Sequence, residues 1–146
     1  MNETPDPSNI GGDDVESTRT FADEILNQEE NQLSSEDQAA VDALPAGNAL
    51  LIVRRGPNKG ARFLLDADQI TVGRHPNADV FLDDVTVSRR HAEITRSASG
   101  FSIKDLDSLN GTHYKGELVE QALLENGSEL QIGKYHFTFY ASSRGA

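Results

Sequence analysis

The chain has 146 residues, a formal net charge of −11 and no cysteine. This length accommodates one domain of ordinary size together with a tail, and the lack of cysteine excludes disulfide scaffolds and cysteine-based zinc or redox sites. The sequence opens without a secretory leader and contains no apolar run long enough to span a membrane, so we expect a cytoplasmic protein.

Residues 1–46 carry the whole charge imbalance, with twelve acidic residues and one basic residue, Arg19. Because bulky apolar residues are scarce there, burial cannot offset the conformational entropy of the chain, and we predict a mostly disordered, acidic regulatory tail. Two short helical patterns occur in it, over residues 20–30 and, more weakly, over residues 34–44. Both are too short to persist alone and would have to order on a surface.

Residues 47–146 balance twelve acidic residues with twelve basic ones. No basic stripe interleaved with aromatic residues appears, and the acidic tail would repel a phosphate backbone, so nucleic acid is not an expected partner. Many short β-rich runs at close spacing, separated by turn signals, predict one all-β domain over residues 47–146, an antiparallel β-sandwich. The predicted strands are ALLIVRR, ARFLL, ITVGR, DVFL, HAEIT, FSIKDL and ELQIGKYHFTFYAS.

Sequence patterns for catalysis and metal binding are missing. The chain has neither a nucleophile elbow nor a P-loop. A Ser88–His91 dyad would need a turn, because residues three apart on an extended strand face opposite sides. The four histidines are isolated, and Asp105 and Asp107 begin a calcium-loop pattern that the next residues do not continue. We therefore expect no enzyme activity, no cofactor and no metal, with Asp105 and Asp107 as turn and surface carboxylates.

Three short loop motifs remain: Gly73-Arg74, Ser88-Arg89-Arg90-His91 and Ser108-Leu109-Asn110-Gly111-Thr112. Each also has an ordinary structural explanation: an exposed arginine after a strand, a serine turn, and an Asn-Gly type I′ hairpin. All three lie between predicted strands, where sandwiches place binding residues. Together they offer guanidinium, hydroxyl and carboxamide donors, which recognition of a phosphorylated side chain requires.

The motifs Gly73-Arg74, Ser88-x-x-His91 and Asn110-Gly111, in this order, resemble those of the forkhead-associated (FHA) domain over residues 48–140. That family has an antiparallel β-sandwich fold whose loops bind phosphothreonine peptides. The resemblance implies that the fold of this domain is such a sandwich and that its ligand is a phosphothreonine peptide.

The same resemblance implies roles for individual residues. Phosphopeptide contacts are implied for Arg74, Ser88, Arg89, Asn110, Thr86 and Leu109. The first three would contact the phosphate, the asparagine would hold the peptide main chain, and the last two would shape the floor and a selectivity pocket. Gly73, His91 and Gly111 would support the loops, and Arg90 would be solvated.

Longer stretches, among them LPAGNALLIVRRGPNKGARFLLD and GRHPNADVFLDDVTVSRRHAE, resemble a narrower group. These are the actinobacterial FHA regulators of glutamate and 2-oxoglutarate metabolism, the group of the glycogen accumulation regulator and the 2-oxoglutarate dehydrogenase inhibitor. In that group Ser/Thr protein kinases phosphorylate a Glu-Thr-Thr motif of the tail, and the phosphothreonine occupies the protein's own FHA site. This chain has Glu16-Ser17-Thr18 there, which implies Thr18 as the acceptor, with Ser17 and Thr20 as alternatives.

The leading hypothesis is a non-enzymatic phosphothreonine-binding regulator. Unphosphorylated, it would bind metabolic enzymes of the 2-oxoglutarate dehydrogenase and glutamate dehydrogenase type; phosphorylated at Thr18, it would bind its own tail. The chain from Thr18 to Ala49, about 31 residues, spans roughly 30 Å as a flexible coil, which permits self-binding. The alternative is a plain adaptor that recruits phosphorylated partners such as Ser/Thr kinases. A small β-sandwich hydrolase or carbohydrate binder is a third hypothesis, from a different class.

Overall fold

The computed structural model describes residues 33–144. From Ser35 onward they belong to one compact unit. The candidate acceptors Ser17, Thr18 and Thr20 and the helical pattern over residues 20–30 lie outside the described residues. Within residues 33–144, no helix is both long and apolar enough to cross a membrane.

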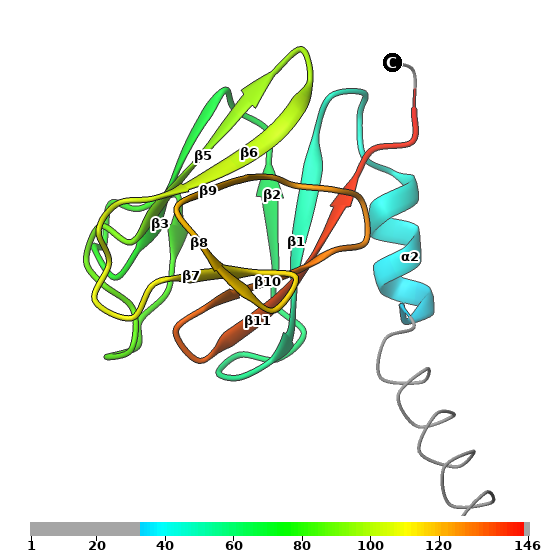
Figure 1. Ribbon diagram of the computed structural model, residues 1–146. Coiled ribbons are helices and arrows are strands. Elements are labelled where there is room, and N and C mark those ends of the chain that lie inside the picture. Colours follow the sequence, from blue (N-terminus) through cyan, green and yellow to red (C-terminus); the bar gives the residue numbers. More distant parts are fainter. Residues whose placement is uncertain (1–32, 145–146) are drawn as a thin grey trace, which may run out of the picture. The chain divides into compact units, whose positions relative to one another are not determined.

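The described chain forms two β-sheets with a shared hydrophobic core (Figure 1). The six-stranded sheet has the order β2-β1-β11-β10-β7-β8, and the five-stranded sheet the order β4-β3-β5-β6-β9. Their strands are β1 (Ala49–Arg55), β2 (Arg62–Leu65), β3 (Gln69–Gly73), β4 (Val80–Phe81), β5 (Ala92–Ser97), β6 (Gly100–Asp105), β7 (Thr112–Tyr114), β8 (Glu117–Val119), β9 (Gln121–Leu123), β10 (Glu129–Ile132) and β11 (Tyr135–Ala141). The predicted antiparallel β-sandwich is confirmed, with β3 and β4 as a single parallel pair among the described strands.

The seven predicted β-rich runs all contain strands. The first six contain β1 to β6 in chain order, and the last divides into β10 and β11 at the turn Gly133-Lys134. The strands β7, β8 and β9 were not predicted. Each has only three residues, which is shorter than the alternation that identifies a strand and well below the usual strand length of about five to six.

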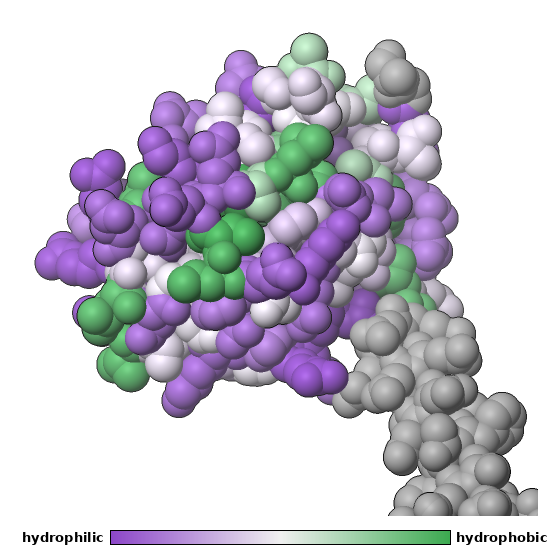
Figure 2. All heavy atoms as spheres, viewed as in Figure 1, coloured by the Kyte–Doolittle hydropathy of each residue, from purple (hydrophilic) through white to green (hydrophobic). Residues whose placement is uncertain are grey.

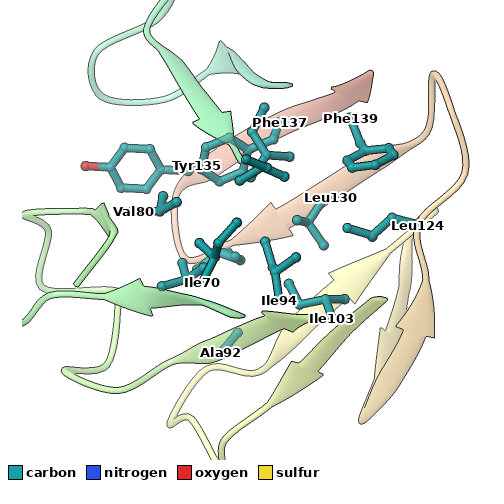
Figure 3. Packing of buried hydrophobic residues seen from close by; sticks show 14 of the residues in the cluster. Ile70, Val80, Ala92, Ile94, Ile103, Leu124, Leu130, Tyr135, Phe137 and Phe139 are labelled. Carbon is teal, nitrogen blue, oxygen red and sulfur yellow. The ribbon is translucent and has the colours of Figure 1, made fainter. Parts of the chain in front are cut away.

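The core between the sheets is built from alternate residues of the strands, as the period of two requires. On β11 the rings of Tyr135, Phe137 and Phe139 point inward (Figure 3). Phe101 of β6 meets Phe139 edge to face, with ring centroids 5.8 Å apart, and Phe63 of β2 meets Phe137 at 6.2 Å. The Phe101–Phe139 pair crosses the sandwich and helps fix how the two sheets are placed, whereas Phe63 and Phe137 belong to the same sheet.

A helix precedes the sandwich: α2 (Ser35–Asp42) confirms the weaker of the two helical patterns. It is attached to the edge strand β2, because Arg62 donates through its Nη1 to the Glu36 carbonyl oxygen at 3.3 Å and its Nε lies 3.6 Å from Asp37. At the other end of the helix, Arg144 Nε donates to the Asp42 carbonyl oxygen at 3.1 Å, where a cation also favours the helix dipole.

The ordered unit therefore begins earlier than the predicted boundary at residue 47. Leu44 is buried to 3% exposure, and Ser142 donates its hydroxyl hydrogen to the Leu44 carbonyl oxygen. Ile52 is the cross-strand partner of Arg62 and so faces the same side of the sheet as the helix attachment. It is buried without belonging to the core cluster between the sheets. The segment 35–46 thus belongs to the domain because it covers the outer face of β1.

Candidate functional site

Three neighbouring loops hold the predicted site residues, and hydrogen bonds join the loops directly. Arg74 donates its backbone N–H to the Ser88 carbonyl oxygen at 3.0 Å. Leu109 donates its N–H to the Ser88 hydroxyl oxygen at 2.9 Å. The Asn110 side chain donates through Nδ2 to the Thr86 carbonyl oxygen at 2.9 Å. The structure therefore brings together residues of the β3–β4, β4–β5 and β6–β7 loops that are far apart in the sequence.

Gly73 ends β3 at the point where the β4–β5 loop comes closest. A Cβ at this position would lie 2.1 Å from the carbonyl oxygen of Arg89 and 3.1 Å from that of Ser88. Both obstacles are backbone atoms, which cannot turn aside as a side chain can. The missing side chain of Gly73 is therefore what lets Arg74 and Ser88 meet.

We expect Gly73→Ala to lower the free energy of unfolding by about 1–3 kcal/mol, the usual cost of overpacking, and to weaken ligand binding by displacing the β4–β5 loop. Urea denaturation and phosphopeptide titration measure the two effects. Gly116→Ala is the control, because a Cβ there meets nothing within 4 Å and costs only its left-handed backbone strain at φ +83°. The control should lose stability and keep its binding, whereas unchanged binding by Gly73→Ala would contradict the packing argument.

His91 is completely buried beneath the loops. Its Nδ1 accepts the backbone N–H of Ser88 at 3.1 Å, so the neutral ring carries its proton on Nε2, which donates to the Gly111 carbonyl oxygen at 2.9 Å. Burial lowers the pKa of His91, opposed by its bond to Gly111 and by Asp105, whose Oδ1 lies 4.0 Å from Nε2. The imidazole is therefore a neutral link between the β4–β5 and β6–β7 loops.

The geometry of Ser88 excludes a Ser–His dyad. A turn does separate Ser88 from His91, but both ring nitrogens are occupied by backbone groups. The Ser88 hydroxyl oxygen accepts from Leu109 instead. Its hydrogen remains available to donate to a ligand.

Asp105 supports the β6–β7 loop, and the expectation that it is a surface carboxylate is wrong. It is half-buried, and it accepts hydrogen bonds from the Ser108 N–H at 3.0 Å, the Ser108 hydroxyl at 2.5 Å and the Thr112 hydroxyl at 2.8 Å. Burial raises the pKa of this carboxyl, but the bonds from Ser108 and Thr112 outweigh burial, so the pKa is lowered. The sequence signal was the Asp-x-x-Ser spacing, which is typical of a carboxylate-capped turn. Asp107 is exposed with φ +58° and is a turn residue, as expected.

Asn110-Gly111 is not a type I′ hairpin turn. That turn needs positive φ at both residues, whereas only Gly111 has one, +81°, and the non-glycine residues of positive φ in the described chain are Asn58, Asp107 and Lys115. A Cβ on Gly111 would lie 2.4 Å from Cδ1 of Leu118. Leu118 is 68% exposed, and Figure 2 shows an apolar patch over its strand, β8.

Thr86 joins the site to residues that were not predicted. Its hydroxyl donates to the Asp84 carboxylate and accepts the Lys134 backbone N–H at 3.0 Å. The hydrogen bonds from Thr86 lower the pKa of Asp84, as do the charges of Lys134 and Arg74, while burial opposes them. Asp84 and Lys134 thus lie on the Thr86 side of the site, and no sequence motif marks either one.

The donors that remain open suit an anion. The guanidinium groups of Arg74 and Arg89 make no hydrogen bond or ion pair with any other residue in the range 33–144. Leu109, whose N–H is bonded to the Ser88 hydroxyl, is 88% exposed and supplies apolar surface. No group of three His, Asp or Glu side chains that could hold a metal occurs in the described part of the chain. The open groups of these loops are therefore guanidinium, hydroxyl and carboxamide groups, which have the chemistry that an anionic ligand requires.

Comparisons with known proteins agree with this geometry. Residues 52–143 match the family described as "Inner membrane component of T3SS, cytoplasmic domain". Among solved structures, one of phosphothreonine-dependent FHA domain interactions superposes with a TM-score of 0.59 at 27% identity, covering 64% of this chain and 95% of that one. The FHA domain of a Chlamydia trachomatis protein gives 0.61 at 32% identity, covering 66% and 99%.

Relatives match over nearly the whole chain. The glycogen accumulation regulator GarA of Mycolicibacterium smegmatis is 46% identical over 144 residues, covering 93% of this chain and 91% of that protein. The oxoglutarate dehydrogenase inhibitor of Corynebacterium jeikeium is 47% identical over 133 residues, covering 90% and 92%. By these matches the chain belongs to the domain family that residues 52–143 match and, more closely, to the FHA-domain regulators that include the GarA proteins and the oxoglutarate dehydrogenase inhibitors of actinobacteria.

Proposed function

We propose that this chain is a cytoplasmic phosphothreonine-binding regulator that inhibits an enzyme of the 2-oxoglutarate dehydrogenase type and is switched off by phosphorylation of Thr18. The observation that carries the proposal is the set of hydrogen bonds that joins the loops holding Arg74, Ser88, Arg89 and Asn110. Neither guanidinium group makes a hydrogen bond or ion pair within residues 33–144. A phosphorylated side chain brings a charge of about −1.5 to −2 and three acceptor oxygens. Those oxygens can accept hydrogen bonds from the two guanidinium groups and the Ser88 hydroxyl, and the negative charge complements the two arginines.

Each residue then has a distinct task. Arg74 and Arg89 bind phosphate oxygens, Arg74 with its planar fork. Ser88 donates its hydroxyl hydrogen to the phosphate while its oxygen accepts from Leu109. Asn110 is oriented by its bond to the Thr86 carbonyl, which leaves its side-chain oxygen to accept a peptide N–H.

The names of the relatives support a regulatory role rather than an enzymatic one. One relative is named an oxoglutarate dehydrogenase inhibitor and another a glycogen accumulation regulator. We extend the first of these activities to this chain, and we propose a glutamate dehydrogenase as a second target and Ser/Thr protein kinases as the enzymes that phosphorylate Thr18. In this proposal residues 47–146 bind the partner and the acidic segment ahead of them carries the switch.

The switch works by competition for one site. A phosphothreonine at position 18 is joined covalently to the domain, which gives it an effective concentration on the order of mM. An external phosphopeptide or an enzyme surface must then displace it. Thr18 rather than Ser17 is the switch in this proposal, because the resemblance to FHA domains implies a phosphothreonine ligand.

We expect protein phosphorylated at Thr18 to stop binding an external phosphothreonine peptide and to stop inhibiting 2-oxoglutarate dehydrogenase. Fluorescence anisotropy with a labelled peptide and a steady-state enzyme assay measure the two effects. The loss should not depend on protein concentration, because closure is intramolecular. Protein phosphorylated at Ser17 is the control and should behave like the unmodified chain.

Full peptide binding by the Thr18-phosphorylated protein would contradict the switch and favour the plain adaptor. Absence of any inhibition by the unmodified protein would contradict the proposed target. The two results are independent, so each part of the proposal is tested separately.

A further inference from the structure

A cavity of about 240 Å³ lies beside the candidate site, between the β3–β4 loop and the Arg89-Arg90 turn. Since a water occupies about 30 Å³ of liquid, the cavity holds the equivalent of roughly eight waters. It is smaller than typical small-molecule sites of about 300–1,000 Å³. Its size suits one amino-acid side chain.

The walls of this cavity have two kinds of surface. The floor includes Val72 and Ala92, which are buried, and the half-buried Leu106. The rim includes His75, Asn77, Arg89 and Arg90. None of the described residues that line the cavity is acidic. An apolar floor under a cationic rim suits a side chain that has methylene groups and ends in an anion.

His75 holds the rim in place. Its backbone N–H donates to the Arg89 carbonyl oxygen at 3.3 Å. Its Nδ1 accepts the Asn77 backbone N–H at 3.0 Å, so the neutral ring carries its proton on Nε2 and presents a donor there. The β3–β4 loop and the Arg89-Arg90 turn are thus connected across the cavity before any ligand binds.

The cavity adjoins the candidate phosphate site. Arg89 belongs to both, and the other rim residues His75 and Arg90 directly follow Arg74 and Arg89 in the chain. A residue two positions from a phosphothreonine in an extended peptide lies about 7 Å away. The cavity is therefore within reach of a side chain close to the phosphothreonine.

We propose that this cavity binds an acidic side chain of the phosphopeptide, with Arg90 as the specificity-determining residue. Glu16, two residues before Thr18, is the side chain of this chain that fits. Its methylene groups would contact the floor and its carboxylate would meet Arg90 and His75 at the rim. The inference rests on the proposed phosphothreonine binding and adds a preference for the sequence around the phosphothreonine.

The test compares three peptides of residues 12–24, each phosphorylated at Thr18: the native sequence, a Glu16→Gln peptide, and a Glu16→Gln peptide also phosphorylated at Ser17. Binding is measured by fluorescence anisotropy to the wild-type protein and to Arg90→Gln. Arg90 is exposed, so its replacement should leave the fold intact, which a thermal melt checks. Lys104→Gln is the control, because Lys104 is exposed and does not line the cavity.

We expect wild type and Lys104→Gln to prefer the native peptide over the Glu16→Gln peptide by up to about five-fold, the range of a partly exposed ion pair. Arg90→Gln should lose this preference and bind the Glu16→Gln peptide as wild type does. Tight binding of the Glu16→Gln peptide that is also phosphorylated at Ser17 would support a site that accepts a phosphate as well as a carboxylate. Equal binding of the native and Glu16→Gln peptides by wild type would overturn the inference, as would a preference that survives in Arg90→Gln. If no phosphothreonine peptide binds at all, the proposed function fails instead.

Discussion

Arg74→Ala should lower the affinity for a phosphothreonine peptide by roughly ten- to 150-fold while the domain stays folded, the range expected for losing a hydrogen bond to a charged group. The Arg74 guanidinium is half-exposed and makes no hydrogen bond or ion pair within residues 33–144. Its removal therefore costs little stability and acts on the ligand. Isothermal titration calorimetry measures the affinity, and circular dichroism checks the fold.

Ser88→Ala should also lower the affinity, because it removes the hydroxyl donor and frees the Leu109 N–H from its partner. Arg74→Lys is the matched control for the arginine. It keeps the positive charge and loses the planar fork, so its affinity should lie between those of wild type and Arg74→Ala. Wild-type affinity in a folded Arg74→Ala protein would show that phosphate binds elsewhere.

His91→Ala should cause a larger loss of stability than Arg74→Ala or Gly73→Ala. The replacement leaves the Ser88 N–H and the Gly111 carbonyl unpaired in the interior, at about 1–3 kcal/mol for each group, and it leaves a cavity where the ring was. Because the ring links two of the site loops, phosphopeptide binding should fall as well. Urea denaturation at pH 7.5 measures the stability and calorimetry the binding.

The contribution of His91 to the free energy of unfolding should depend on pH. Its pKa in the folded protein lies below the ordinary value of 6.5, so the unfolded chain takes up the proton first as the pH falls. The stabilisation by His91 is therefore complete above pH 6.5 and is lost as the pH falls below that value. The difference in unfolding free energy between wild type and His91→Ala should shrink from pH 7.5 to pH 5. A constant difference would contradict a neutral, buried ring.

The strands could be predicted from sequence wherever a β-rich apolar pattern continues for several positions. The seven-residue strands β1, with a continuous apolar run, and β11, with alternating buried residues, are examples. The three-residue strands β7 to β9 could not be predicted, because they are too short to show an alternation, and β7 and β9 pair with strands distant in sequence, β10 and β6. The parallel pairing of β4 with β3 has the same origin. A local pattern indicates the propensity of a segment to form a strand, whereas the assembled sheets decide which strand it pairs with.

The candidate site, too, could be predicted from the sequence only in part. Gly73-Arg74, Ser88 and Asn110 were identified because they form short motifs, and their proximity is a finding of the structure. Lys134 and Asp84 were missed, since one contributes a backbone N–H and the other a carboxylate to Thr86. A backbone donor can come from any residue type and leaves no trace in the sequence. The ordering of residues 35–46 with the sandwich was missed for a related reason, because Leu44 is bound through its carbonyl oxygen by Ser142, which is distant in sequence.

The attachment of α2 to β2 limits how far the segment ahead of Ser35 could reach in the proposed switch. From Ser35 back to Thr18 the chain has about 17 residues, which extend over at most roughly 56–61 Å. A domain of roughly 110 residues has a radius of gyration of about 13 Å, so the path over its surface between opposite poles is roughly 50 Å. With the boundary at residue 47, the same segment would have ample slack. With the helix attached, the segment has almost no spare length for a site at the far pole. A deletion of about five residues after Thr20 removes about 17 Å of reach. Such a deletion would prevent binding within one molecule and leave binding between molecules possible, so it distinguishes the two.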